Sequence, residues 1–134
     1  MRCLIVDDSA DFVDAARGLL GCAGITVVGV ASTSADALGL FEQLRPDVTL
    51  VDINLGVESG FELAQQLHRA GKPSPSPVIL ISTHAEQDFA DMIAASPAVG
   101  FLCKTALSPG AIRDLLGGRD GDDLAGRVRG LGSC

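Results

Sequence analysis

Short apolar runs alternate along the chain with longer amphipathic segments. The short runs are mostly aliphatic and rich in β-branched residues, which is typical of strands buried on both faces of a sheet. Each is followed by a segment whose apolar residues recur at helical spacing. Five such pairs predict an α/β fold, a doubly wound five-stranded parallel sheet with helices on both faces. The predicted strands are RCLIV (2–6), ITVVGVA (25–31), VTLVD (48–52), PVILIS (77–82) and VGFLC (99–103).

The segments between the predicted strands carry helix signals at their ends. Ser34 is predicted to cap the second helix, and Gly71 is placed to follow the end of the third. Ser108 and Pro109 form a cap followed by a proline at the first helical position. The predicted helices lie in 11–22, 34–44, 60–71, 86–96 and from 108 onward, and the apolar residues expected to face the sheet are Phe12, Ala16, Leu19, Leu20, Ala37, Leu38, Phe41, Leu44, Phe61, Leu63, Ala64, Leu67, Phe89, Met92 and Ile93.

Two segments lie outside this alternation. KPSPSP (72–77) falls between the third helix and the fourth strand, so we interpret it as a surface loop rather than a proline-rich recognition motif. The C-terminal stretch is rich in glycine and charge, which predicts a last helix that is short or broken near Gly117. We therefore expect one domain over 1–117 and a flexible tail over 118–134, which could contain one weak extra helix.

Composition limits the class of protein. A chain of 134 residues can bury a core without metal or disulfide staples. Its net charge of −7 should repel phosphate backbones, so direct nucleic acid binding is not expected. The opening residues carry charge too early for a signal peptide, and no apolar stretch approaches the roughly 20 residues of a membrane span. The four cysteines, Cys3, Cys22, Cys103 and Cys134, have no metal-like spacing, and we expect a reduced, cytoplasmic setting without membrane contact.

Polar residues that could bind ligands or take part in a reaction lie at the carboxyl ends of the predicted strands. In this class of fold, sites form at that edge of the sheet. Asp7 and Asp8 follow the first strand, and Asp52 ends the third. Ser82 and Lys104 end the fourth and fifth. Three neighbouring carboxylates repel one another unless a cation neutralises them, and Mg²⁺ is the usual cation where phosphate chemistry follows.

Each of these residues also has a purely structural interpretation. Asp7 or Asp8 could simply cap the helix that follows. Asp52 could be a turn residue, Ser82 a locally bonded hydroxyl and Lys104 a solvated surface charge. Their joint position at one edge of the sheet favours the functional interpretation.

The motifs LIVDDS, LVDINLGVESGFEL, VILIS and GFLCK resemble the receiver (phosphoacceptor) domain of two-component system response regulators, and the resemblance covers residues 2–116. It implies a (βα)5 flavodoxin-like fold with strand order 2-1-3-4-5. Asp52 would accept the phosphoryl group, and Asp7, Asp8, Asp52 and the backbone carbonyl of Asn54 would hold Mg²⁺, for which Mn²⁺ could substitute. Lys104 and Ser82 would bind the phosphoryl oxygens, and Ser82 and Phe101 would form the switch.

The resemblance also implies a function and partners. The phosphoryl group would come from the phosphohistidine of a sensor histidine kinase or a phosphotransfer protein. Such a domain is a signalling phosphoacceptor and not an enzyme with outside substrates, because it catalyses only its own phosphorylation and dephosphorylation. Its output would pass through the surface of the fourth helix, fifth strand and fifth helix, which could also form a homodimer.

Some residues depart from the family pattern. Thr105 stands where many receivers have proline after the lysine, and a cis bond there would cost about 3 kcal/mol without proline, so the geometry of the Lys104 loop stays open. Gly56 replaces a proline and predicts a more mobile loop after Asp52. Asn54 and His84 occupy positions that tune dephosphorylation in the family. These two residues do not by themselves predict the lifetime of the phosphorylated state.

Other classes of protein fit less well. A haloacid-dehalogenase-like phosphatase would need a second acid two residues after its nucleophile, where this chain has Asn54. A nucleotide- or flavin-binding module would need a glycine-rich phosphate loop after the first strand. A degenerate receiver that acts as a phosphorylation-independent interaction or dimerisation module remains an alternative. The sequence also allows either a stand-alone receiver or the receiver of a longer DNA-binding regulator.

Overall fold

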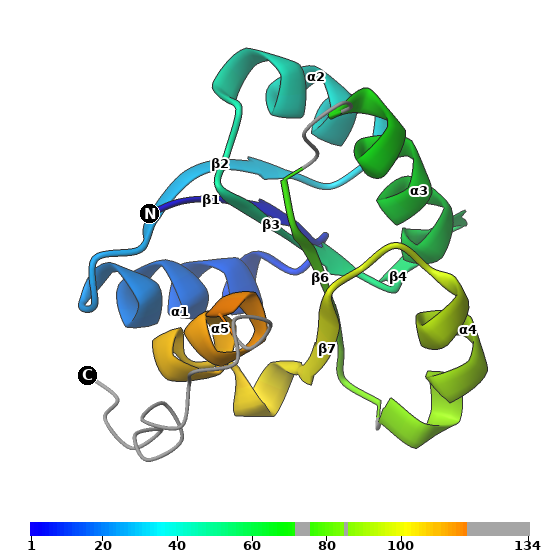
Figure 1. The fold of residues 1–134 in the computed structure, drawn as a ribbon. Helices are drawn as coiled ribbons and strands as arrows, with labels where there is room; N and C mark the ends of the chain where they lie inside the picture. The colour runs from blue at the N-terminus through cyan, green and yellow to red at the C-terminus, as the bar shows by residue number, and fades with distance from the viewer. Residues whose placement is uncertain (72–75, 85, 118–134) are drawn as a thin grey trace.

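A computed structural model describes residues 1–71, 76–84 and 86–117 (Figure 1). Its main sheet has five parallel strands in the order β2-β1-β3-β6-β7, which is the predicted order 2-1-3-4-5 when only these strands are counted. The prediction of a doubly wound α/β fold is therefore confirmed. The strands are β1 (Arg2–Val6), β2 (Thr26–Ala31), β3 (Val48–Asp52), β6 (Val78–Ser82) and β7 (Gly100–Cys103).

Alternating residues of the strands form two separate cores. Leu4, Val51 and Leu80 belong to the cluster that includes the buried residues of α2 and α3. Ile5, Leu50 and Ile79 point to the other face and pack with residues of α1 and α5. Figure 1 shows these helices on the two sides of the sheet, as expected for strands that are apolar on both faces. The helices are α1 (Ala10–Gly21), α2 (Ser34–Leu44), α3 (Gly60–Ala70), α4 (Ala90–Ala95) and α5 (Pro109–Gly117).

The predicted helix ends are partly wrong. The N-cap of α2 is Thr33, whose hydroxyl accepts a hydrogen bond from Asp36 N–H, so Ser34 is the first helical residue instead of the cap. Gly71 ends α3 in right-handed geometry, so it is not the left-handed residue of a glycine-terminated helix. Ser108 does accept a hydrogen bond from Ala111 N–H at the start of α5.

The structure also contains a hairpin and two 3-10 turns that the apolar pattern did not indicate. Two short antiparallel strands, β4 (Asn54–Leu55) and β5 (Glu58–Ser59), follow Asp52. Gly56 turns this hairpin with φ of +66°, a conformation that suits glycine. The predicted fourth helix begins as a 3-10 turn, η1 (Glu86–Phe89), before the short α4, and Met92 is 53% exposed instead of facing the sheet. The other turn, η2 (Lys104–Ala106), follows β7.

Two further observations concern the helices and one buried cysteine. Within the described residues, no helix is long and apolar enough to cross a membrane. Burial raises the pKa of the Cys3 thiol to about 12, so this cysteine behaves as a small apolar residue of the core. The predicted tail over 118–134 and most of the predicted loop over 72–77 lie outside the described residues.

Candidate phosphoacceptor site

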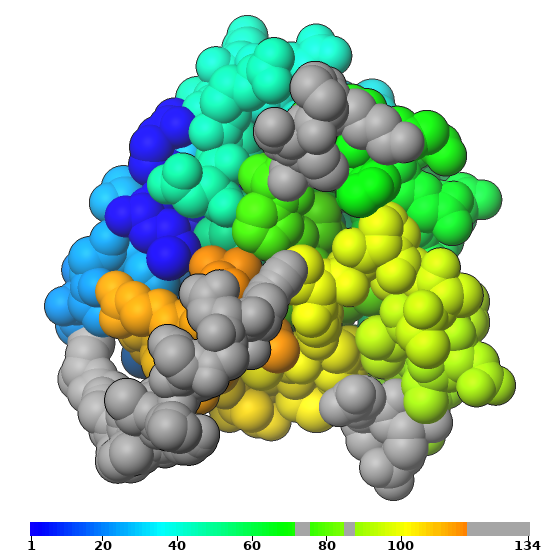
Figure 2. Space-filling model, in the orientation of Figure 1, coloured from blue at the N-terminus to red at the C-terminus, as the bar shows by residue number. Residues whose placement is uncertain are grey.

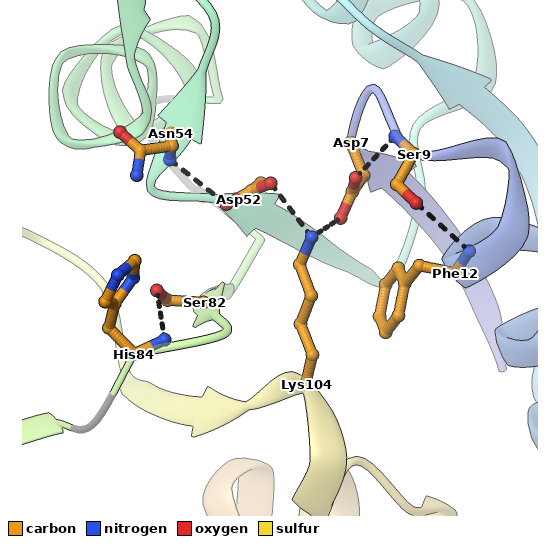
Figure 3. Close-up of polar contacts among 8 residues, drawn as sticks. All are labelled: Asp7, Ser9, Phe12, Asp52, Asn54, Ser82, His84 and Lys104. Atoms are coloured by element: carbon orange, nitrogen blue, oxygen red, sulfur yellow. Dashed lines mark hydrogen bonds and ion pairs between the residues drawn. The ribbon is translucent and has the colours of Figure 1, made fainter.

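Three central strands end in the same local turn, which aims their polar side chains at the carboxyl edge of the sheet (Figure 3). In each case an oxygen of the last polar side chain accepts a hydrogen bond from the backbone N–H two residues later, a turn typical of Asp and Ser. The bonds are Ser9 N to Asp7 Oδ1 (2.8 Å), Asn54 N to Asp52 Oδ1 (3.0 Å) and His84 N to Ser82 Oγ (3.0 Å).

Helix capping does not account for the acidic pair. The N-cap of α1 is Ser9, whose hydroxyl accepts a hydrogen bond from Phe12 N–H over 3.3 Å. Asp7 is buried behind this cap and Asp8 is exposed beside it. The two carboxylates are therefore free for another role than capping.

Lys104, which follows the edge strand β7, contacts carboxylates at the ends of the central strands β1 and β3. From the end of β7 its Nζ reaches Asp7 Oδ2 at 2.7 Å and Asp52 Oδ2 at 3.0 Å, as Figure 3 shows. The Lys104 side chain is only 11% exposed, and its Nζ lies 4.8 Å from the centre of the Phe12 ring. Phe12 was predicted only as a core residue of its helix, because nothing in the local pattern indicates a contact with a lysine 92 positions away. The predicted lysine thus lies at the centre of the site.

Burial and the contacts between Asp52 and Lys104 shift the pKa of each of these two groups in opposite directions. Burial raises the pKa of Asp52, and the Asp7 charge adds to this, so the hydrogen bonds from Lys104 and Asn54 offset the rise only in part. Burial lowers the pKa of Lys104, but its hydrogen bond to Asp52, its close ion pair with Asp7 and the charges of both carboxylates together raise it above the ordinary value. Lys104 is therefore held as a cation against a carboxylate that is poorly solvated.

The three carboxylates are close enough to share a cation. One oxygen from each of Asp7, Asp8 and Asp52 lies within 4.8 Å of the others. Asp7 Oδ2 is buried and is ion-paired with Lys104, yet it accepts no hydrogen bond of good geometry from the residues that the structure describes. An all-oxygen donor set with a buried, incompletely satisfied oxygen fits Mg²⁺, which prefers carboxylates and keeps several waters.

Gly60 sets the path of the chain beside Asp52, a role that none of the sequence motifs indicated. Its N–H donates to the carbonyl oxygen of Ile53 over 2.8 Å. A Cβ at this position would collide with the carbonyl oxygen of Asp52 and the Cα of Ile53. A glycine just ahead of the apolar helical pattern was the only sequence signal of this close approach.

The remaining predicted residues lie around this centre. Ser82 is buried, and its hydroxyl makes the local bond to His84 that the structural interpretation predicted. Asn54 lies at the start of the hairpin and is exposed. Phe101 is 8% exposed and packs in the core on the α3 side, so in this structure its ring is already inside.

Comparison with known families agrees with this geometry. The family model of the response regulator receiver domain matches residues 3–116. The chain belongs to the response regulator receiver family. Receiver domains are signalling domains of two-component systems, so the resemblance noted from the motifs is confirmed.

Several known proteins are similar to this chain. The transcriptional regulatory protein YvfU of Bacillus subtilis is 32% identical over 105 residues, which cover 78% of this chain and 52% of that protein. The response regulator GacA of Pseudomonas aeruginosa is 32% identical over 109 residues, covering 79% and 49%. The chain therefore spans about half the length of these relatives. The signal receiver domain of the response regulator NarL from Mycobacterium tuberculosis has a TM-score of 0.75 and 29% identity, covering 90% of this chain and 96% of that one.

Proposed function

We propose that this receiver accepts a phosphoryl group on Asp52 from the phosphohistidine of a sensor histidine kinase or phosphotransfer protein. The observation that carries the proposal is the contact of Lys104 Nζ with Asp52 Oδ2 at 3.0 Å, beside two further carboxylates. A lysine buried against one carboxylate of an acidic cluster is ready to bind the anion that this carboxylate would acquire. Catalysis of phosphoryl transfer consists mainly of such positioning and charge neutralisation.

Asp7, Asp8 and Asp52 would hold Mg²⁺, or Mn²⁺ in its place, together with the backbone carbonyl of Asn54. Bound there, the cation would supply the positive charge that the phosphoryl oxygens need. An oxygen of Asp52 attacks the phosphorus, an O–P bond forms and the P–N bond breaks, with its electron pair returning to the imidazole nitrogen of the donor. Lys104 and Ser82 then contact the phosphoryl oxygens.

The donor would approach from the side of α1. An open pocket of about 280 Å³ lies there, bordered by Asp7, Asp8, Val13, Arg17 and Val30 among others. We propose that this transfer takes place in the cytoplasm, the reduced setting that the cysteine pattern predicts.

The phosphoryl group would be read out through Ser82. The new charge on Asp52 attracts the Ser82 hydroxyl, which moves the loop after β6. The surface of α4, β7 and α5 changes as this loop moves. Phe101, buried here, would then be in the position that the phosphorylated state favours. A partner or a second copy of the chain would bind this surface.

The experiment that tests the phosphoryl transfer is intact-mass spectrometry after incubation with Mg²⁺ and acetyl phosphate or phosphoramidate, and then with a cognate kinase. We expect one added phosphoryl group on the wild type, labile to hydroxylamine, and none on Asp52→Asn. A label that persists in Asp52→Asn would identify another acceptor. No label on either protein, even with the kinase, would favour the phosphorylation-independent interaction module.

A further inference from the structure

The β4–β5 hairpin that follows Asp52 is fastened to the domain at two adjacent points. Leu55 is buried in the core cluster that also contains Ala37 of α2 and Phe61 of α3. Its cross-strand partner Glu58 is half-buried, and Oε1 of Glu58 accepts a hydrogen bond of 2.8 Å from Ser34 N–H. Since Val57 at the tip is fully exposed, packing does not hold the turn itself.

The contact of Glu58 with α2 is specific because Ser34 N–H is one of the donors that a helix leaves unpaired at its start. The Thr33 hydroxyl accepts from Asp36 N–H, and the Thr33 carbonyl accepts from Ala37 N–H. Glu58 supplies the acceptor for Ser34 from a segment 24 residues away. Its carboxylate also lies at the positive end of the helix dipole, which strengthens the bond.

Asn54 is the strand residue of this hairpin nearest to Asp52. It pairs with Ser59, the neighbour of Glu58, and its N–H bonds to Asp52 Oδ1. We propose that Glu58 is a positioning residue that holds the Asn54 carbonyl in place for the divalent cation by fastening the hairpin to the start of α2. This inference rests on the proposed function, because it presupposes a cation shared by Asp52 and the Asn54 carbonyl.

The test is the Mg²⁺ affinity of folded variants, measured by titration well below their unfolding temperatures. Glu58→Ala and the longer Glu58→Met both remove the acceptor and should lower Mg²⁺ affinity about tenfold, the scale of effect seen for residues that orient metal ligands. Glu58→Gln keeps an acceptor oxygen and should stay within about twofold of wild type, because only a screened charge is lost. Glu62→Ala, on the exposed first turn of α3, is the matched control for that charge. The amide resonance of Ser34 should shift in the Ala and Met variants alone.

The outcomes distinguish a positioning role for Glu58 from a general effect of its charge. Wild-type affinity in Glu58→Ala, or in Glu58→Met if the Ala variant does not fold, would overturn the inference. An equal loss in Glu58→Gln or Glu62→Ala would also overturn it, because long-range charge would then account for the loss. Wild-type protein that binds no Mg²⁺ would contradict the proposed function itself, whereas normal wild-type binding with unchanged Glu58 variants would contradict only the positioning role.

Discussion

Two segments leave the centre of the sheet at its carboxyl edge, and they are packed very differently. The segment after Asp52 continues through the hairpin into α3, an eleven-residue helix with five buried residues. The segment after Ser82 continues through η1 into α4, which has six residues, none of them buried although the structure describes all six. Figure 2 shows the yellow-green atoms of this second segment standing out at one side of the molecule.

The second segment is nevertheless linked to the first. The Phe89 ring at the end of η1 lies 6.2 Å from that of Phe61 and 6.0 Å from that of His84. A ligand shifts an equilibrium only by its differential affinity for two states, so a change at Asp52 moves most easily the elements with the fewest buried contacts. The comparison therefore contrasts a firmly packed segment after Asp52 with a loosely packed segment after Ser82, which is the one that we propose for signal output.

The largest expected effect is the loss of a buried leucine from α3. Leu67 is almost fully buried in the core on that face. Leu67→Ala should lower the free energy of unfolding by about 3 kcal/mol, because it removes transfer energy and leaves a cavity. Denaturant unfolding followed by circular dichroism measures this change. A loss below about 1 kcal/mol would show that this site collapses easily and would remove the contrast with α4.

The second effect concerns the three carboxylates of the candidate cation site. Asp8→Ala should lower Mg²⁺ affinity at least tenfold, about 1.4 kcal/mol, and should leave the metal-free protein as stable as wild type or slightly more so, because carboxylate repulsion is relieved. Isothermal titration with Mg²⁺ and a thermal melt without it measure both quantities. Ser82→Ala, outside the carboxylate group, is the control and should bind Mg²⁺ like wild type. Unchanged affinity in Asp8→Ala would remove Asp8 from the site.

The third effect concerns the coupling of the two segments. Beryllofluoride, a mimic of the phosphoryl group on Asp52, should shift wild-type amide resonances across 86–116. In Ser82→Ala the mimic should still bind, with shifts confined to the surroundings of Asp52, because the hydroxyl that follows the phosphoryl oxygens is missing. Amide NMR of both proteins makes the comparison. Equally extensive shifts would leave Ser82 as a strand-end hydroxyl with a local bond only.

A smaller effect is the pH dependence of stability that Asp52 contributes. Its pKa is raised by burial, so ionised Asp52 is less favourable in the folded than in the unfolded protein. The stability it contributes is full below the ordinary carboxyl pKa of about 4 and is lost as pH rises through the folded-state pKa. Asn at this position does not ionise. Without divalent cations, the melting temperature of Asp52→Asn minus that of wild type should therefore increase by a few degrees from pH 3 to pH 8. A difference that stays constant or reverses over this range would argue against a raised pKa.

The smallest expected effect lies in α4. Met92 is half exposed, so Met92→Ala should change the free energy of unfolding by less than about 0.5 kcal/mol, in contrast to Leu67→Ala. The same denaturant experiment applies. A loss comparable to that of Leu67→Ala would mean that α4 is a packed part of the core and would end the distinction between the two segments.

The sequence by itself determined the sheet and which strand-end side chains come together at its carboxyl edge. Short apolar runs rich in β-branched residues favour strands covered on both faces, and the five strands were predicted to within a residue at each end. Because parallel strands bring their carboxyl ends to one edge, the proximity of Asp7, Asp52 and Lys104 also followed from their places in the chain. Both results depend on periodicity and chain order, which are local properties.

Tertiary structure alone decided which atoms meet. Lys104 contacts Asp52 across 52 residues, and Glu58 reaches Ser34 across 24, so no local pattern records either hydrogen bond. The N-cap of α2 fell to Thr33 instead of Ser34 because either hydroxyl suits the position, and the path of the chain selects between them. The predicted fourth helix became a 3-10 turn and a short helix because helical propensity is weak without a buried face to stabilise it.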